Sequence, residues 1–284
     1  MLARRIIGPV RWRDVLRGTR TIAFESYGVR VRVEVGNAAS VRRLEPLLPE
    51  RRRPCDPEQA QLHYALRSDG AAGFDVVAGT SRVALSAELD VALAVLEAQI
   101  RAGIALRAAE AVFVHAGVVA RRGRAVLVPG LSFSGKTTLV AALVRAGASY
   151  LSDEYAVLDA DGRVHPYPKP LSVRAPGSHR QTERLVESIG GTQTQAALPV
   201  GLIVVTAFRP GGAWAPERRS AGQGALALLA NTVPARTRPA ESMRAVRAAS
   251  ESALVLEGER GEAEKAAAPV LAELDAAGAI GSPA

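Results

Sequence analysis

Eight consecutive residues near the middle of the chain have the types and spacing of a phosphate-binding loop. The segment 130–137 reads GLSFSGKT, which fits the pattern GxxxxGK[ST]; an apolar run precedes it and a helical pattern follows. In such a loop, backbone N–H groups and the positive end of the following helix surround phosphate oxygens. The residues expected to bind nucleotide phosphates are Gly130, Ser132, Ser134, Gly135, Lys136, Thr137 and Thr138.

The polar residues at the end of this segment have distinct expected roles. Lys136 would reach the β- and γ-phosphates, Thr137 would hold Mg²⁺, and Thr138 would donate to the α-phosphate. The cofactors that this pattern predicts are therefore ATP and Mg²⁺. No base-reading motif accompanies the loop, so ATP and GTP both stay open as the nucleotide.

Phosphoryl transfer also requires a carboxylate near the metal ion. The apolar run 200–208 does not end in an acid, but Asp153 and Glu154 follow the short apolar run 149–152, one predicted helix after the loop. Neighbouring side chains at a strand end point in opposite directions. One acid can therefore face the metal or act as the base, while the other binds a metal-bound water. The candidate metal ligands are Thr137, Asp153 and Glu154.

The order of these motifs resembles the catalytic domain of HPr kinase/phosphorylase, which shares its core with ATP-dependent phosphoenolpyruvate carboxykinase. The resemblance rests on HAGV at 115–118, the loop GLSFSGKTT, the helix end RAGA and the segment YLSDEYAVL, and it covers roughly residues 111–175, with weaker support to about 258. It implies that His115 belongs to the catalytic site and that Asp153 acts as general base on an acceptor serine. Glu154 stands where that family has a second aspartate.

The segment 165–174 departs from that family. It reads HPYPKPLSVR and replaces a glycine-rich signature tied to the reverse, phosphorylase activity. We therefore expect neither that activity nor HPr as the substrate. The segment resembles one found in uncharacterised relatives, some of them linked to peptide-modifying gene clusters. Lys169 and Arg174 lie in this proline-stiffened stretch, where they would neutralise transition-state charge or hold an acidic substrate. Of the two, Arg174 is the predicted catalytic residue.

The elements that must position these residues predict an α/β fold: a phosphate-loop core with a mixed sheet flanked by helices, preceded by a smaller α+β region. The expected domains are 1–85 and 86–284, with a connecting amphipathic helix over 86–110. Alternating or apolar runs predict strands, and the helical period predicts helices. Expected strands are 20–25, 29–35, 61–67, 74–78, 111–120, 124–130, 198–208 and 252–258, with two more in 149–168. Expected helices are 39–48, 220–232, 239–249 and 262–278, and the segment 130–148 is expected to be a loop followed by a helix.

Composition limits the possible partners. The 284 residues carry a net charge of +8, and residues 1–53, with 13 arginines and 5 acids, contain the whole excess. That segment lacks lysine clusters and interleaved aromatics, so a nucleic-acid partner is not expected. We expect Arg51, Arg52 and Arg53 to hold an acidic peptide. One cysteine, Cys55, excludes an internal disulfide framework, and no apolar run reaches the roughly 18–20 residues of a membrane span. The expected location is the cytoplasm.

The predicted function is an ATP- and Mg²⁺-dependent kinase that transfers the γ-phosphoryl group to a hydroxyl, most directly a serine, of a peptide or small protein. Two alternatives stay open: a kinase of a small metabolite, and a non-catalytic module in which nucleotide binding orders a partner interface. The acceptor's identity and assembly into a homo-oligomer are likewise open from the sequence.

Overall fold

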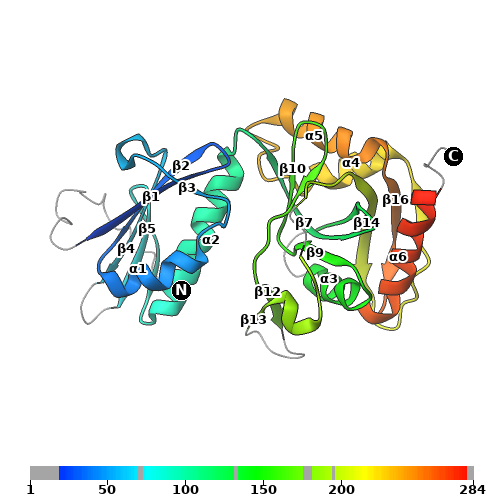
Figure 1. Cartoon of the computed structure of the whole chain (residues 1–284), viewed down its shortest axis with the longest axis horizontal. Coiled ribbons are helices and arrows are strands. Elements are labelled where there is room, and N and C mark those ends of the chain that lie inside the picture. Colours follow the sequence, from blue (N-terminus) through cyan, green and yellow to red (C-terminus); the bar gives the residue numbers. More distant parts are fainter. Residues whose placement is uncertain (1–18, 69–72, 131–133, 175–180, 194–195, 280–284) are drawn as a thin grey trace, which may run out of the picture. The chain divides into compact units, whose positions relative to one another are not determined.

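The computed structural model describes residues 19–68, 73–130, 134–174, 181–193 and 196–279. It is an α/β protein in which mixed sheets are flanked by helices, and the chain forms two compact units, Met1–Glu110 and Ala111–Ala284. Within the described residues, no helix combines the length and the apolar character needed to cross a membrane. Figure 1 shows the elements of both units.

The N-terminal unit is built on a six-stranded sheet in the order β3-β1-β2-β4-β5-β6, in which only the β2–β4 pair is parallel. Side chains alternate between the two faces of each strand, and one face forms the core: in VRVRVEV every second residue is a buried valine. The strands are β1 (Arg20–Ser26), β2 (Val29–Val35), β3 (Arg53–Pro54), β4 (Leu62–Ser68), β5 (Phe74–Ala78) and β6 (Ser81–Ser86). The helices are α1 (Ala38–Leu44) and α2 (Leu89–Arg107), with single 3₁₀ turns at Glu45–Leu47 and Pro57–Gln59.

Helix α2 belongs to this first unit, and the division of the chain falls after Glu110 instead of after residue 85. Its buried side chains recur at helical spacing, with Leu93, Leu96, Ile100 and Ile104 on one face, and the helix contacts β4, β5 and β6. The hydroxyl of Tyr64 on β4 donates to the Gln99 carbonyl at 2.9 Å. The segment expected to connect the two domains is therefore the helical layer of the first one.

The C-terminal unit contains an eight-stranded sheet in the order β11-β10-β7-β8-β14-β16-β15, with β9 paired to one end of β7. Strands β8, β14 and β16 are parallel, and β7 and β8 form an antiparallel hairpin. The strands are β7 (Val112–Arg121), β8 (Arg124–Pro129), β9 (Ser149–Ser152), β10 (Tyr155–Leu158), β11 (Val164–His165), β14 (Val200–Phe208), β15 (Glu217–Arg219) and β16 (Leu254–Arg260). A separate hairpin pairs β12 (Leu171–Arg174) with β13 (Gln181–Arg184), and Val186–Ile189 is a 3₁₀ turn.

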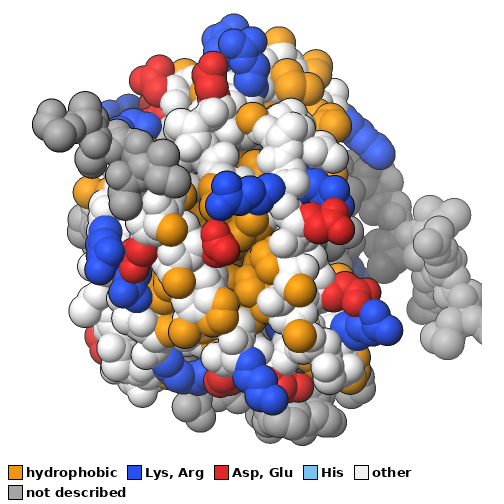
Figure 2. Space-filling model, turned by 90° about the vertical axis from the view of Figure 1, so that its right-hand side faces the viewer, with side chains coloured by type: hydrophobic (Ala, Val, Ile, Leu, Met, Phe, Trp, Pro, Cys, Tyr) orange, Lys and Arg blue, Asp and Glu red, His pale blue; other side chains and the backbone are white. Residues whose placement is uncertain are grey.

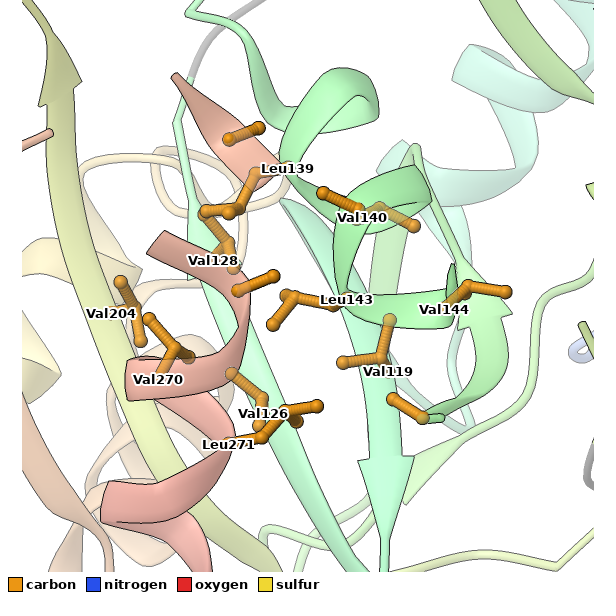
Figure 3. Packing of buried hydrophobic residues seen from close by; sticks show 14 of the residues in the cluster. Val119, Val126, Val128, Leu139, Val140, Leu143, Val144, Val204, Val270 and Leu271 are labelled. Atoms are coloured by element: carbon orange, nitrogen blue, oxygen red, sulfur yellow. The ribbon is translucent and has the colours of Figure 1, made fainter. Parts of the chain in front are cut away.

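Helices cover both faces of this sheet, α3 and α6 on one and α4 and α5 on the other (Figure 1). Alternation along β8 divides its side chains between two apolar clusters. Val126 and Val128 face α3 and α6 (Figure 3), and Ala125 and Leu127 face α4 and α5. The helices are α3 (Lys136–Arg145), α4 (Ala221–Leu229), α5 (Pro239–Glu251) and α6 (Ala263–Ala279). Both clusters contain residues of β8, β14 and β16, so their packing holds the strands at whose ends the candidate site lies.

Candidate functional site

Helix α3 begins directly after Gly135, at the end of the predicted phosphate loop. Gly135 has φ +81°, a left-handed conformation that a residue with a Cβ adopts only with strain. No acidic residue lies in the first turn of α3, so nothing there competes with an anion for the positive end of the helix. Residues 131–133, and with them the expected ligand Ser132, lie outside the described residues.

Ser134 supports the fit of this loop to a phosphate. Its Oγ is buried and has no hydrogen-bond partner within the described part of the chain. A Cβ at Gly130 would lie 2.8 Å from that oxygen, so a side chain at Gly130 would close the space beside it. A buried hydroxyl without a partner costs free energy, and an oxygen of a bound phosphate would supply the missing acceptor.

Lys136 is the first residue of α3 and lies close enough to the acid pair to interact electrostatically with both members. Burial lowers the pKa of its ammonium group, while the charges of Asp153 and Glu154 oppose that shift. A partly desolvated ammonium attracts phosphate more strongly than one in bulk water. The expected phosphate-binding residue and the expected carboxylates are thus brought together by the fold.

Asp153 lies between two hydroxyl groups. Its Oδ2 accepts a hydrogen bond from Thr137 Oγ1 at 3.2 Å, and its Oδ1 accepts one from Tyr150 OH at 3.2 Å. The residue is only 6% exposed. Burial and the neighbouring Asp153 charge raise the pKa of the Tyr150 hydroxyl, so that hydroxyl remains a donor. Two of the three predicted metal ligands, Thr137 and Asp153, are therefore in direct contact.

Glu154 has different surroundings. Its Oε2 lies 2.8 Å from Lys169 Nζ, within ion-pair distance, but this oxygen is buried and makes no hydrogen bond of regular geometry among the described residues. The side chain as a whole is 25% exposed. Ser152 fixes the turn that separates the two acids, because its Oγ accepts from the backbone N–H groups of Glu154 and Tyr155 at 3.2 and 3.0 Å. The adjacent carboxylates consequently have separate partners, as the strand-end geometry predicts.

His115 lies on β7 beside the same acids. It pairs across the sheet with Tyr155, and the two rings are 4.9 Å apart. Burial lowers the pKa of its imidazole; Lys136 acts in the same direction, and Glu154 opposes them. The neutral ring is therefore favoured at neutral pH, and it can donate or accept a hydrogen bond without adding positive charge.

Lys169 and Arg174 differ in what the structure describes of them. The backbone of Arg174 ends β12 and pairs with Gln181, and its side chain lies outside the described part, so its catalytic role remains a prediction. Lys169 is 16% exposed at its side chain and reaches Glu154. Its carbonyl lies 2.9 Å from the Tyr150 hydroxyl, so the single hydrogen of that hydroxyl is shared between this carbonyl and Asp153 Oδ1. The proline-rich segment thus contributes a lysine to the site.

Arg260 is a residue of this site that the sequence analysis missed. It ends β16, is 3% exposed, and donates from Nη2 to the Gly135 carbonyl at 3.0 Å and from Nη1 to the Gly261 carbonyl at 3.1 Å. Its Nε has no hydrogen-bond partner among the residues described. Burial lowers its pKa. Nothing distinguishes this arginine in an arginine-rich sequence, since only the parallel pairing of β16 with β14 brings it to the loop.

The oxygen donors around Thr137 suit Mg²⁺, which takes few protein ligands, better than they suit a metal ion whose ligands all come from protein. The described residues contain no group of three or more His, Cys, Asp or Glu side chains that could enclose a metal ion. Mg²⁺ usually keeps several waters and takes one or two carboxylates together with substrate phosphates. The Thr137 hydroxyl and the Asp153 carboxylate fit that requirement. Glu154 is the next residue in the chain after Asp153.

The arginines expected to hold an acidic peptide lie in the N-terminal unit. Arg51, Arg52 and Arg53 line a cavity of about 260 Å³, which Glu25, Glu50 and Glu110 also line. The Arg51 guanidinium lies 4.9 Å from the centre of the Tyr27 ring, and Arg53 pairs with Glu25. This cavity carries acids as well as arginines, and peptide binding there remains a prediction. Figure 2 shows a different side of the molecule, the one on which α6 lies in Figure 1, and basic and acidic side chains are interspersed there too.

No protein-family model matches the chain, and no curated protein matches its sequence.

Proposed function

We propose that this chain is an ATP- and Mg²⁺-dependent kinase built on a phosphate-loop core. The observation that carries the proposal is the contact between Thr137, the residue after the loop lysine, and the Asp153 carboxylate. A threonine hydroxyl at a helix N-terminus that donates to a strand-end carboxylate is the arrangement that holds Mg²⁺ beside nucleotide phosphates in such proteins. The loop sequence alone would not require that carboxylate to be in this position.

The residues of the site would divide the binding task. The α3 N-terminus and Ser134 Oγ would donate to phosphate oxygens, and Lys136 would pair with the terminal phosphates. Thr137 and Asp153 would hold Mg²⁺, which neutralises phosphate charge during transfer. Arg260 would keep the Gly135 carbonyl in place from behind the loop. His115, whose pKa burial lowers, would leave the positive charge of the site to Lys136 and Lys169.

The phosphoryl acceptor is proposed to be a hydroxyl, most directly a serine of a peptide or small protein. This part rests on the resemblance of residues 111–175 to the catalytic domain of HPr kinase/phosphorylase. A small-metabolite acceptor would give a phosphorylated metabolite in place of a phosphopeptide, and mass spectrometry of the products formed from ATP would distinguish the two.

Nucleotide binding by Lys136 variants tests the proposal. Lys136→Ala should weaken binding of ATP with Mg²⁺ roughly 10- to 100-fold, since a charge-assisted hydrogen bond contributes about 1.5–3 kcal/mol. Calorimetry of wild type and variant measures this change. Lys265→Ala, which removes an exposed lysine of α6, is the matched control and should bind as wild type does.

ADP formation gives the second readout. Wild type should release ADP faster than Lys136→Ala, with water as the acceptor when no other is supplied. Equal ATP affinity in wild type and Lys136→Ala would disprove the loop assignment. Tight binding without any ADP formation would instead favour the non-catalytic nucleotide-binding module.

A further inference from the structure

An exposed aromatic ring lies at the end of the strand next to the phosphate loop. Phe208 is the last residue of β14 and is 49% exposed, whereas every other aromatic side chain in the described part of the chain is buried or half-buried. Exposure of a single apolar side chain is common and carries no argument by itself. The position of this ring relative to the loop is what gives it a role.

Phe208 lies at the edge of the sheet from which the loop starts. Strands β8 and β14 are parallel, so their carboxyl ends lie at the same edge. Ile203 pairs with Leu127, two residues before the end of β8, and β14 then continues to Phe208. Phe208 therefore projects roughly 10 Å past the level at which β8 enters the loop. Ligands of open α/β sheets bind at this edge, outside the carboxyl ends of the strands.

The ring also points to the side of the sheet on which α3 begins. Leu202 and Val204 of β14 pack in the apolar cluster that contains α3 and α6, and Phe208 follows them at the same period of two. Its partner on β16 is Arg260, whose guanidinium carbon lies 5.7 Å from the centre of the Phe208 ring. That distance is within the range of a cation–π contact.

Arg260 connects this ring to the loop. Its side chain is buried, and its Nη2 donates to the Gly135 carbonyl at 3.0 Å, directly before the first residue of α3. One guanidinium thus contacts both the end of the phosphate loop and one face of the Phe208 ring. The other face of the ring is the surface that a planar ligand group can cover.

We propose that Phe208, backed by Arg260, is the platform on which the base of the bound nucleotide stacks while the phosphates occupy the loop. This inference rests on the proposed kinase function and adds a base-binding residue to it. The ribose separates base from phosphates, so the base must lie beside the loop and not in it. Stacking requires only the flat face of a base, so Phe208 binds ATP and GTP alike and leaves any choice between them to other groups.

Tripolyphosphate separates base binding from phosphate binding, because it carries three linked phosphates without a base or a ribose. Calorimetry measures the affinities for ATP, GTP and tripolyphosphate, each with Mg²⁺. Phe208→Ala should weaken binding of ATP and of GTP by a similar factor, roughly 5- to 100-fold, which is the usual effect of removing a stacked aromatic side chain. Its affinity for tripolyphosphate should stay within about twofold of wild type, which also shows that the loop is intact.

Two further variants serve as controls. Phe208→Trp keeps an aromatic face and should retain most of the ATP affinity. Leu226→Ala removes another exposed apolar side chain, from α4 on the opposite face of the sheet, and should bind all three ligands as wild type does.

Arg260 is tested as the residue that positions the ring. Arg260→Met should weaken tripolyphosphate binding, since the Gly135 contact is lost, and should weaken ATP binding by a larger factor, since the ring also loses its support. In a Phe208→Ala background the factors for the two ligands should be equal. A larger factor for ATP that persists without the ring would exclude Phe208 as the route of this effect.

The outcomes separate this inference from the kinase proposal on which it rests. Unchanged ATP affinity in Phe208→Ala, or an equal loss for ATP and tripolyphosphate, would overturn the platform while wild type still binds ATP at the loop. Failure of wild type to bind both ATP and tripolyphosphate with Mg²⁺ would instead disprove the kinase proposal itself.

Discussion

At the scale of single residues, burial shifts the pKa of two basic groups beside the phosphate loop in the same direction. His115 and Lys136 are both partly buried, and burial lowers both pKa values. The ordinary pKa of lysine is about four units above that of histidine, so the same kind of shift favours a neutral ring at His115 near pH 7 but leaves Lys136 cationic. The site therefore keeps its positive charge at the loop, where phosphate would bind.

This lowered pKa makes His115 a source of acid sensitivity. The folded-state pKa lies below the ordinary value of 6.5, so the contribution of the neutral ring to stability is full above about pH 6.5. It is lost as the pH falls through the folded-state value. His115→Asn should therefore lose less stability than wild type between pH 7.5 and 5.5, as measured by urea unfolding at each pH. Equal losses in the two proteins would contradict this prediction.

At the scale of elements, the end of β16 supports the start of α3. The buried Arg260 guanidinium donates to the Gly135 carbonyl, which also accepts from the Leu139 N–H at 3.1 Å as part of the helix. A hydrogen bond from a charged donor contributes about 1.5–3 kcal/mol. The loop conformation thus depends on a strand whose residues lie far from the loop in the sequence.

Arg260→Met should weaken ATP binding about tenfold, because methionine retains much of the apolar stem but cannot donate to Gly135. Calorimetry with ATP and Mg²⁺ measures the change. Arg209→Met is the matched control: Arg209 adjoins the paired strand β14, is exposed and pairs with Glu259, so its replacement should leave affinity unchanged. Equal affinity in both variants would show that the Arg260 contact does not support the loop.

The packing of α3 on β7 depends on Gly117. A Cβ there would lie 2.5 Å from Cγ2 of Val140, closer than carbon atoms can approach. Gly117→Ala should therefore lower the free energy of unfolding by about 1–3 kcal/mol, the usual cost of overpacking. Measured by chemical denaturation, the same substitution in a Val140→Ala background should cost less, since the crowding methyl groups are gone. An equal cost in both backgrounds would exclude this contact as the cause.

At the scale of the whole molecule, the unit that carries the candidate site has its own core. Its two apolar clusters contain only residues between Val112 and Leu274, and every described residue of the site lies in the same unit. A fragment of residues 111–284 should therefore unfold cooperatively and bind ATP with Mg²⁺ within about threefold of the full chain. Circular dichroism and calorimetry measure these two properties. A fragment that lacks cooperative unfolding would show that the core requires residues 1–110.

Much of the framework could be predicted from local patterns. Alternation predicted β2, a continuous apolar run predicted β8, and the helical period predicted α2 and α6, because each pattern follows the side-chain period or the burial of its element. Short strands such as β3 and β15 were missed, since two or three residues carry no measurable period. The end of the N-terminal unit was also misplaced: amphipathicity shows that 86–110 forms a helix with a buried face, but does not show which sheet that face covers.

The sequence by itself determined the α/β class with helix-flanked mixed sheets, the loop pattern GLSFSGKT and the neighbouring carboxylates, because each is written in consecutive residues. Tertiary structure decided the rest. It placed the Asp153 carboxylate within hydrogen-bond distance of the Thr137 and Tyr150 hydroxyls, and the Glu154 carboxylate within ion-pair distance of Lys169. It also placed the Arg260 guanidinium against the Gly135 carbonyl. These contacts depend on strand order and on the direction of each side chain, which arise only when segments distant in the sequence pack together.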